Sequence, residues 1–137
     1  MGDMSFTSDV DAVVTVHHEP RRVAAVLMDA ERLPAWNPAF TSVTAGPGSA
    51  YRVHALGGAL RGTLEYVDGT ADIAMLITVP GLREESTWVL EVSGSGTRVT
   101  HRIRQQGALV PLIGAKEAAM VPHKRLARLQ AHLGGAL

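Results

Sequence analysis

The order of secondary-structure signals along the chain is the strongest constraint on its fold. A strand-like run from Val10 to Val16 passes directly into a helical segment that begins at Glu19-Pro20. A shorter helical segment follows, from Ala30 to Trp36, and Pro38 ends it. The sequence is then strand-like to about residue 105, and one long helix from Leu109 to Leu133 closes the chain. We expect an α+β fold in which a curved sheet wraps around the last helix and leaves an apolar hollow beneath it.

Six strands are predicted between the short helices and the long one. Turn-forming glycine, proline and aspartate residues occur at short intervals in this region. The pairs Gly57-Gly58 and Asp68-Gly69 are typical of tight hairpins. Together with the first strand they predict a seven-stranded antiparallel sheet. The six predicted strands cover residues 40–44, 50–56, 59–67, 71–79, 83–92 and 97–104.

The long helix is expected to bury one apolar stripe against the sheet. Its apolar residues recur at spacings of three and four, as in an amphipathic helix. Met120 and His123 fall at the margins of this stripe, and the basic side chains, Arg125 among them, fall mostly outside it. The predicted stripe consists of Ala119, Pro122, Leu126, Leu129 and Leu133.

The composition excludes several classes of protein. A length of 137 residues suits one domain, predicted over residues 10–137 after a flexible leader at 1–9. The absence of cysteine excludes disulfides, thiolate zinc sites and a catalytic cysteine. Thirteen basic and thirteen acidic residues cancel, which argues against nucleic acid as the partner. Since no apolar run approaches the ~20 residues of a membrane span and no signal peptide is present, we expect a cytoplasmic monomer or homodimer without membrane insertion.

Two polar side chains are predicted to point into the hollow. Val99, His101 and Ile103 share one face of the last strand, and the two aliphatic residues mark that face as the inner one. An imidazole there can donate to a ligand carbonyl or act as a general acid or base near neutral pH. The alternative is a core histidine satisfied by a neighbouring hydroxyl or water. Tyr51 shares an inner face with Val53, and its phenol is a candidate hydrogen-bond donor.

The remaining expected contacts are mostly apolar. Trp36 and Trp88 offer flat surface to a ligand, although packing in a wall or lid explains them equally well. Met75 and Met120 suit an adaptable pocket, and plain core packing is the alternative. His123 is expected at the mouth of the hollow or on the surface. The full set expected around a ligand is Trp36, Tyr51, Val53, Leu64, Tyr66, Ile73, Met75, Trp88, Val99, His101, Met120 and His123.

No motif for a metal or cofactor is present. His17-His18-Glu19 resembles a metal site in composition alone, because adjacent side chains on an extended segment point to opposite faces. The glycine-rich turns at residues 46–48 and 94–96 are not followed by a helix, as a phosphate-binding loop requires. No nucleophile elbow anchors a hydrolase triad. We therefore predict neither a metal nor a cofactor.

Several local phrases resemble the START-like, helix-grip (SRPBCC) superfamily, and within it the polyketide cyclase/dehydrase and lipid-transport group of small, bacterial-type domains. The phrases are Val16 to Val26, Asp29 to Pro38, Trp88-Val89-Leu90 and Gly96 to Thr100, and the resemblance spans about residues 10–133. Ala24 departs from it, since many relatives place a tryptophan there.

The resemblance implies three functions, because one scaffold carries different activities. The leading one is binding of an apolar or aromatic small molecule, polyketide- or lipid-like, between the sheet and the last helix. The second is a cofactor-independent polyketide cyclase or dehydrase that promotes aldol closure or water loss, with His101 as proton shuttle and Tyr51 as carbonyl donor. The third is a protein-interaction module whose interior is filled by its own side chains.

Overall fold

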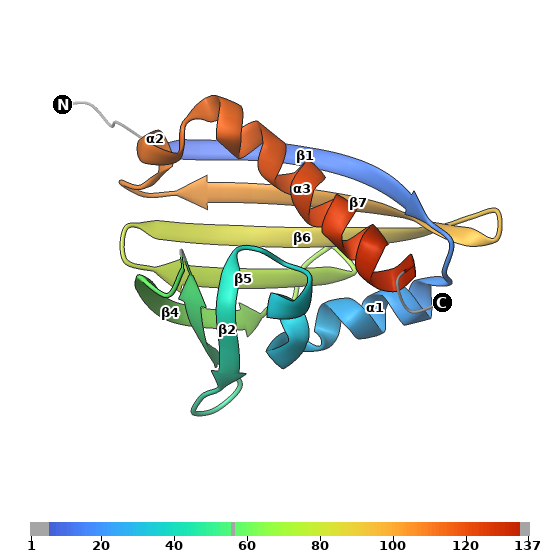
Figure 1. The fold of residues 1–137 in the computed structure, drawn as a ribbon, viewed down its shortest axis with the longest axis horizontal. Coiled ribbons are helices and arrows are strands. Elements are labelled where there is room, and N and C mark those ends of the chain that lie inside the picture. Colours follow the sequence, from blue (N-terminus) through green and yellow to red (C-terminus); the bar gives the residue numbers. More distant parts are fainter. Residues whose placement is uncertain (1–5, 56, 135–137) are drawn as a thin grey trace.

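Seven antiparallel strands form one curved sheet in the computed structural model, which describes residues 6–55 and 57–134. The strand order is β1-β7-β6-β5-β4-β3-β2, so the first and last strands are neighbours (Figure 1). The predicted seven-stranded antiparallel sheet is confirmed. The strands are β1 (Thr7–Val16), β2 (Phe40–Ala45), β3 (Tyr51–Ala55), β4 (Leu60–Tyr66), β5 (Ile73–Val79), β6 (Leu82–Ser93) and β7 (Gly96–Gln106).

Two short helices, α1 (Pro20–Met28) and the 3₁₀ helix η1 (Ala30–Ala35), follow β1 as predicted. Pro20 occupies the first turn of α1, where its missing amide hydrogen costs no helical bond. At the other end of α1 the Tyr66 hydroxyl donates to the carbonyl oxygen of Leu27 at 2.7 Å. A side chain of the sheet thus satisfies a carbonyl that has no partner within the helix.

The predicted long C-terminal helix is interrupted. It consists of α2 (Val110–Ile113) and α3 (Ala115–Gly134), separated by Gly114. Gly114 has φ of 83°, in the left-handed region that glycine adopts without steric cost. Its amide donates to Val110 and its carbonyl accepts from Ala118, so Gly114 ends one helix and starts the next. The prediction of one continuous helix was wrong here, because helical periodicity does not detect a single-residue reversal.

Strand β1 begins three residues earlier than the predicted strand. Thr7 pairs with Gln106, and Asp9 pairs with Arg104, so this part of the predicted leader is an ordered edge strand. Met1 to Ser5 lie outside the described residues, as do Leu56, which was predicted to end a strand, and Gly135.

Helix α3 crosses the inner face of the sheet, mainly over β1 and β7 (Figure 1). Its buried residues are spaced by three and four, but the stripe is rotated from the predicted one. Ala119 is exposed and Ala118 is buried in its place, about 100° away around the helix. Arg125, predicted outside the stripe, is 4% exposed. The buried face of α3 consists of Ala118, Pro122, Arg125, Leu126, Leu129 and Leu133.

No helix in residues 6–55 and 57–134 combines the length and the apolar character needed to cross a lipid bilayer.

Replacing Tyr66 by phenylalanine tests the bond between the sheet and α1. The Tyr66→Phe substitution leaves the Leu27 carbonyl half-buried without its partner, so we expect the free energy of unfolding to fall by about 1–2 kcal/mol. Tyr51→Phe is the matched control, since it removes a hydroxyl from the other ring of the same edge-to-face pair, 6.3 Å away. Urea denaturation measures both, and equal effects would contradict the assigned role of Tyr66.

Candidate functional site

Strand alternation correctly predicted which side chains enter the interior. Eight of the twelve residues expected around a ligand are buried on or against the inner face of the sheet. Seven of them, all but His101, belong to one hydrophobic core that also includes residues of α1 and α3. Their burial is established, whereas a role in ligand contact stays a prediction. The eight are Trp36, Val53, Leu64, Ile73, Met75, Trp88, Val99 and His101.

Tyr51 and Tyr66 lie half-buried at the edge of this core, but their hydroxyls differ in availability. The Tyr66 hydroxyl is engaged by the Leu27 carbonyl. Burial, together with the neighbouring Tyr51 and Asp29, raises the pKa of Tyr66 above its ordinary value, so the phenol stays neutral. Tyr66 therefore supports the wall, and of the two rings Tyr51 is the better candidate for contact with a ligand.

Met120 and His123 do not lie on the inner face. Met120 is 46% exposed and His123 is exposed, because the stripe through Ala118 and Pro122 turns both side chains away from the sheet. His123 instead borders an open groove of about 450 Å³ on the outer side of α3. The other residues of that groove are Asp9, Val10, Asp11, Arg102 and Ala119.

A buried ion pair joins α3 to the sheet, and the sequence reasoning missed it. Arg125 donates from Nη1 to Glu84 Oε2 at 2.7 Å and from Nη2 to Glu84 Oε1 at 3.1 Å. Gln105 on β7 donates to the same Oε1 at 2.9 Å. Both charged residues are only 4% exposed. Strand phase held a signal for Glu84, which alternates in register with buried Trp88, and Arg125 lies three residues after buried Pro122.

Both members of this pair are charged at neutral pH. Burial acts to raise the pKa of Glu84, but the charge and hydrogen bonds of Arg125, with the bond from Gln105, outweigh it and hold the pKa below its ordinary value. The two charges cancel, so the interior holds a strong local dipole without net charge. Such a bidentate geometry is the arrangement in which burial of two charges is best compensated.

His101 lies beside the ion pair and is neutral. Its Nδ1 is 3.1 Å from the carbonyl oxygen of Thr87. A carbonyl only accepts, so Nδ1 carries the proton and Nε2 presents a lone pair. Burial and the positive charge of Arg125 lower the pKa of His101 from 6.5 to about 3. The expected role as an acid or base near neutral pH therefore lacks the required pKa.

Aromatic rings enclose His101 on one side. Its ring is stacked on Trp88, with centroids 3.6 Å apart and planes 12° apart. Trp36 meets Trp88 edge to face, with centroids 5.8 Å apart. The predicted aromatic surface is thus concentrated around one imidazole, and its position in the interior is fixed by packing.

Three buried polar atoms of this cluster have no hydrogen-bond partner among residues 6–55 and 57–134. They are Trp88 Nε1, His101 Nε2 and Arg125 Nε. Buried polar groups in folded proteins nearly always have a partner, so each one calls for an explanation. Their presence on three contiguous elements, β6, β7 and α3, marks the polar part of an otherwise apolar interior.

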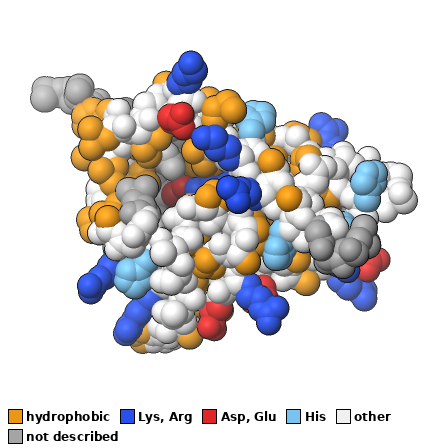
Figure 2. All heavy atoms as spheres, in the orientation of Figure 1, with side chains coloured by type: hydrophobic (Ala, Val, Ile, Leu, Met, Phe, Trp, Pro, Cys, Tyr) orange, Lys and Arg blue, Asp and Glu red, His pale blue; other side chains and the backbone are white. Residues whose placement is uncertain are grey.

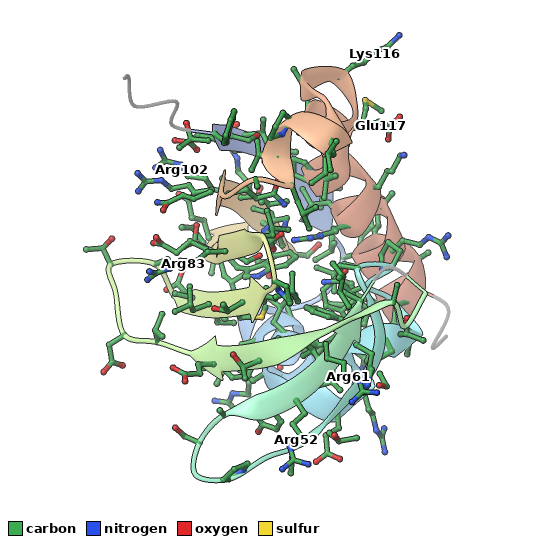
Figure 3. The ribbon with its side chains drawn as sticks, turned by 90° about the vertical axis from the view of Figure 1, so that its left-hand side faces the viewer. Arg52, Arg61, Arg83, Arg102, Lys116 and Glu117 are labelled. Carbon is green, nitrogen blue, oxygen red and sulfur yellow. The ribbon has the colours of Figure 1, made fainter. Side chains whose placement is uncertain are left out.

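Figure 2 shows that the face carrying α3 is hollowed to the left of the helix, and acidic atoms are visible inside the hollow. Among the described residues Glu84 is the buried carboxylate of the sheet. The exposed charges lie elsewhere: Figure 3 shows Arg83 and Arg102 on the side of the sheet away from α3, while Lys116 and Glu117 project from its first turn.

Removing Arg125 tests the energetic importance of the ion pair. Arg125→Met leaves the Glu84 carboxylate buried and unpaired, so we expect a loss of about 3–5 kcal/mol in the free energy of unfolding. The Glu84→Gln/Arg125→Met double variant should recover part of this loss, because no charge stays buried. Arg128→Met on the exposed side of α3 is the control. A double variant no more stable than Arg125→Met would contradict this account.

The depressed pKa of His101 predicts acid sensitivity. Below pH 6.5 the unfolded chain takes up a proton at this residue while the folded protein does not, so stability falls steadily toward pH 3. Below about 4.5 the protonation of Glu84 in the unfolded chain adds to the loss. The free energy of unfolding, measured against pH, should slope less in His101→Gln between 6.5 and 4.5. Titration of His101 near 6.5 in the folded protein, seen by NMR, would refute the assignment.

Comparison with known proteins places this chain in a family. Residues 7–134 match the family model described as polyketide cyclase / dehydrase and lipid transport. A search of curated protein sequences finds no match.

Solved structures share the fold at low identity. A Thermus thermophilus protein is 21% identical with a TM-score of 0.73, and a START superfamily protein from Mycobacterium smegmatis is 14% identical with a TM-score of 0.77; each alignment covers 94% of this chain and 99% of the other. Truncated norcoclaurine synthase from Thalictrum flavum is 10% identical with a TM-score of 0.68 and 97% coverage of both chains. The family model spans nearly the whole chain, and this protein therefore belongs to the polyketide cyclase / dehydrase and lipid transport family.

Proposed function

We propose that the protein binds an apolar or aromatic small molecule, polyketide- or lipid-like, between the sheet and α3. The observation that carries the proposal is the inner face of the sheet: it is lined by aliphatic, thioether and aromatic side chains and carries a few buried polar residues, among them Glu84, Ser86 and His101. Small-molecule sites have this make-up, in which apolar walls supply affinity and a few polar groups set orientation. Family membership supports the same reading.

A binding role fits the polar cluster better than proton-transfer catalysis does. His101 is neutral, and a pKa of about 3 makes it both a poor acid and a weak base near neutral pH. The Glu84 carboxylate is occupied by Arg125 and Gln105. The chemistry these residues supply in the ground state is therefore hydrogen bonding to a guest, and a cyclase role would depend on holding the substrate in a reactive shape.

Binding of naphthalene, followed by NMR, tests the proposal. We expect chemical-shift changes at the Trp88 indole and at the Met75 methyl group, because both line the interior. Since the chain has only two tryptophans, Trp36→Phe assigns the Trp88 indole signal directly. Changes confined to the outer groove near Asp11 and Ala119, or none at all with naphthalene and a fatty alcohol, would contradict the proposal.

A pair of variants on β5 checks the location. Met75→Gln places an amide on the inner face at nearly constant length, and we expect at least tenfold weaker naphthalene binding. Leu76→Gln makes the same kind of change on the opposite face of β5 and should leave the affinity unaltered. Urea denaturation verifies that both variants fold. Equal affinities of the two would place the ligand outside the interior.

A further inference from the structure

The unpartnered atoms of the polar cluster define what kind of group the interior can receive. All three belong to side chains that are at least nine-tenths buried: Trp88 and His101 are 0% exposed and Arg125 is 4% exposed. Trp88 and His101 are direct cross-strand neighbours with stacked rings. Arg125 reaches the same inner face from α3 through its bonds to Glu84, two inward positions along β6 from Trp88.

The hydrogen-bonding capacity of each atom follows from its chemistry. Trp88 Nε1 is a donor and so is Arg125 Nε, because indole and guanidinium nitrogens carry hydrogen. His101 Nε2 is an acceptor, since Nδ1 of the same ring donates to Thr87. To form hydrogen bonds with all three unpartnered atoms, a bound ligand must therefore supply two hydrogen-bond acceptors and one hydrogen-bond donor.

The charge balance of the cluster further narrows the chemical class of the ligand group. Glu84 already neutralises Arg125 with two hydrogen bonds, so no positive charge is left to compensate a buried anion. Burial of a ligand carboxylate here would be unfavourable because the charged group loses its hydration. It would also place a negative oxygen against the lone pair of His101 Nε2, which repels it. A ketone or an ether supplies acceptors only and leaves Nε2 unpaired. A hydroxyl supplies one donor and two acceptor lone pairs.

We propose that the guest carries an uncharged hydroxyl group, of an alcohol, phenol or enol, whose hydrogen is donated to His101 Nε2 while ligand oxygen lone pairs accept from Trp88 Nε1 and Arg125 Nε. The proposal rests on the binding function proposed above and gives it a chemical class. The polar cluster then selects for the O–H group, and the apolar walls hold the remainder of the molecule.

Three probes with one ring system separate the contributions: naphthol, methoxynaphthalene and naphthoate. We expect the protein to bind naphthol about tenfold more tightly than methoxynaphthalene, which lacks the O–H donor, and to bind naphthoate most weakly. Naphthol should also shift the Trp88 indole N–H signal downfield, as a new hydrogen bond does, while methoxynaphthalene shifts it less.

His101→Phe removes the acceptor and keeps an aromatic ring stacked on Trp88. In this variant naphthol should lose its advantage, while methoxynaphthalene binding should persist and report an intact fold. His132→Phe is the matched control: it makes the same substitution at an exposed histidine of α3 that contributes none of the three unpartnered atoms, so the preference for naphthol should remain.

The outcomes distinguish the two proposals. Equal binding of naphthol and methoxynaphthalene to the unaltered protein would overturn the hydroxyl assignment and leave the binding function standing. A preference for naphthoate would overturn the assignment in favour of an anion. If none of these probes nor naphthalene binds, the proposed function itself fails. If the His101→Phe protein does not fold, the comparison of naphthol with methoxynaphthalene in the unaltered protein still decides the question.

Discussion

The bidentate contact between Arg125 and Glu84 is the interaction on which the rest of the interior depends. It fixes α3 to β6 at one register, because a shift of one residue along either element would bury both charges without partners. Around this fixed point the apolar residues of α3 pack against β1 and β7, and Gln105 adds a further hydrogen bond to the carboxylate. An apolar interface alone would tolerate sliding far better than this pair does.

The polar cluster also governs the chemistry available inside. Arg125 contributes positive charge next to His101 and so helps to keep that ring neutral, while the Thr87 carbonyl selects its tautomer. His101 therefore acts as a neutral hydrogen-bond acceptor through Nε2 and does not change its protonation state near neutral pH. This outcome follows from burial combined with one neighbouring charge, and neither is visible at His101 in the sequence.

Much of the architecture was predictable, because strand alternation and turn residues are local signals. The seven strands and the inward phase of Val53, Leu64, Met75 and His101 follow from period-two patterns and turn residues, and the two short helices follow from prolines and helical spacing. The predictions failed where a single backbone angle or a long-range pairing decides: the left-handed Gly114 splits the last helix, and burial of Arg125 depends on a carboxylate presented by a distant strand. Hydrophobic periodicity predicts that an arginine such as Arg125 is exposed to solvent. Its burial could be predicted only by knowing that Glu84 lies opposite it in the fold.

The distance along the chain between the two charged residues has a consequence for folding. Arg125 follows Glu84 by 41 residues and belongs to the last helix, so the sheet is synthesised with an uncompensated carboxylate on the face that will become its interior. Until α3 docks, this carboxylate lacks the ion pair that compensates its burial in the folded protein. Docking of the C-terminal helix therefore completes the charge compensation inside the sheet after all seven strands have been synthesised.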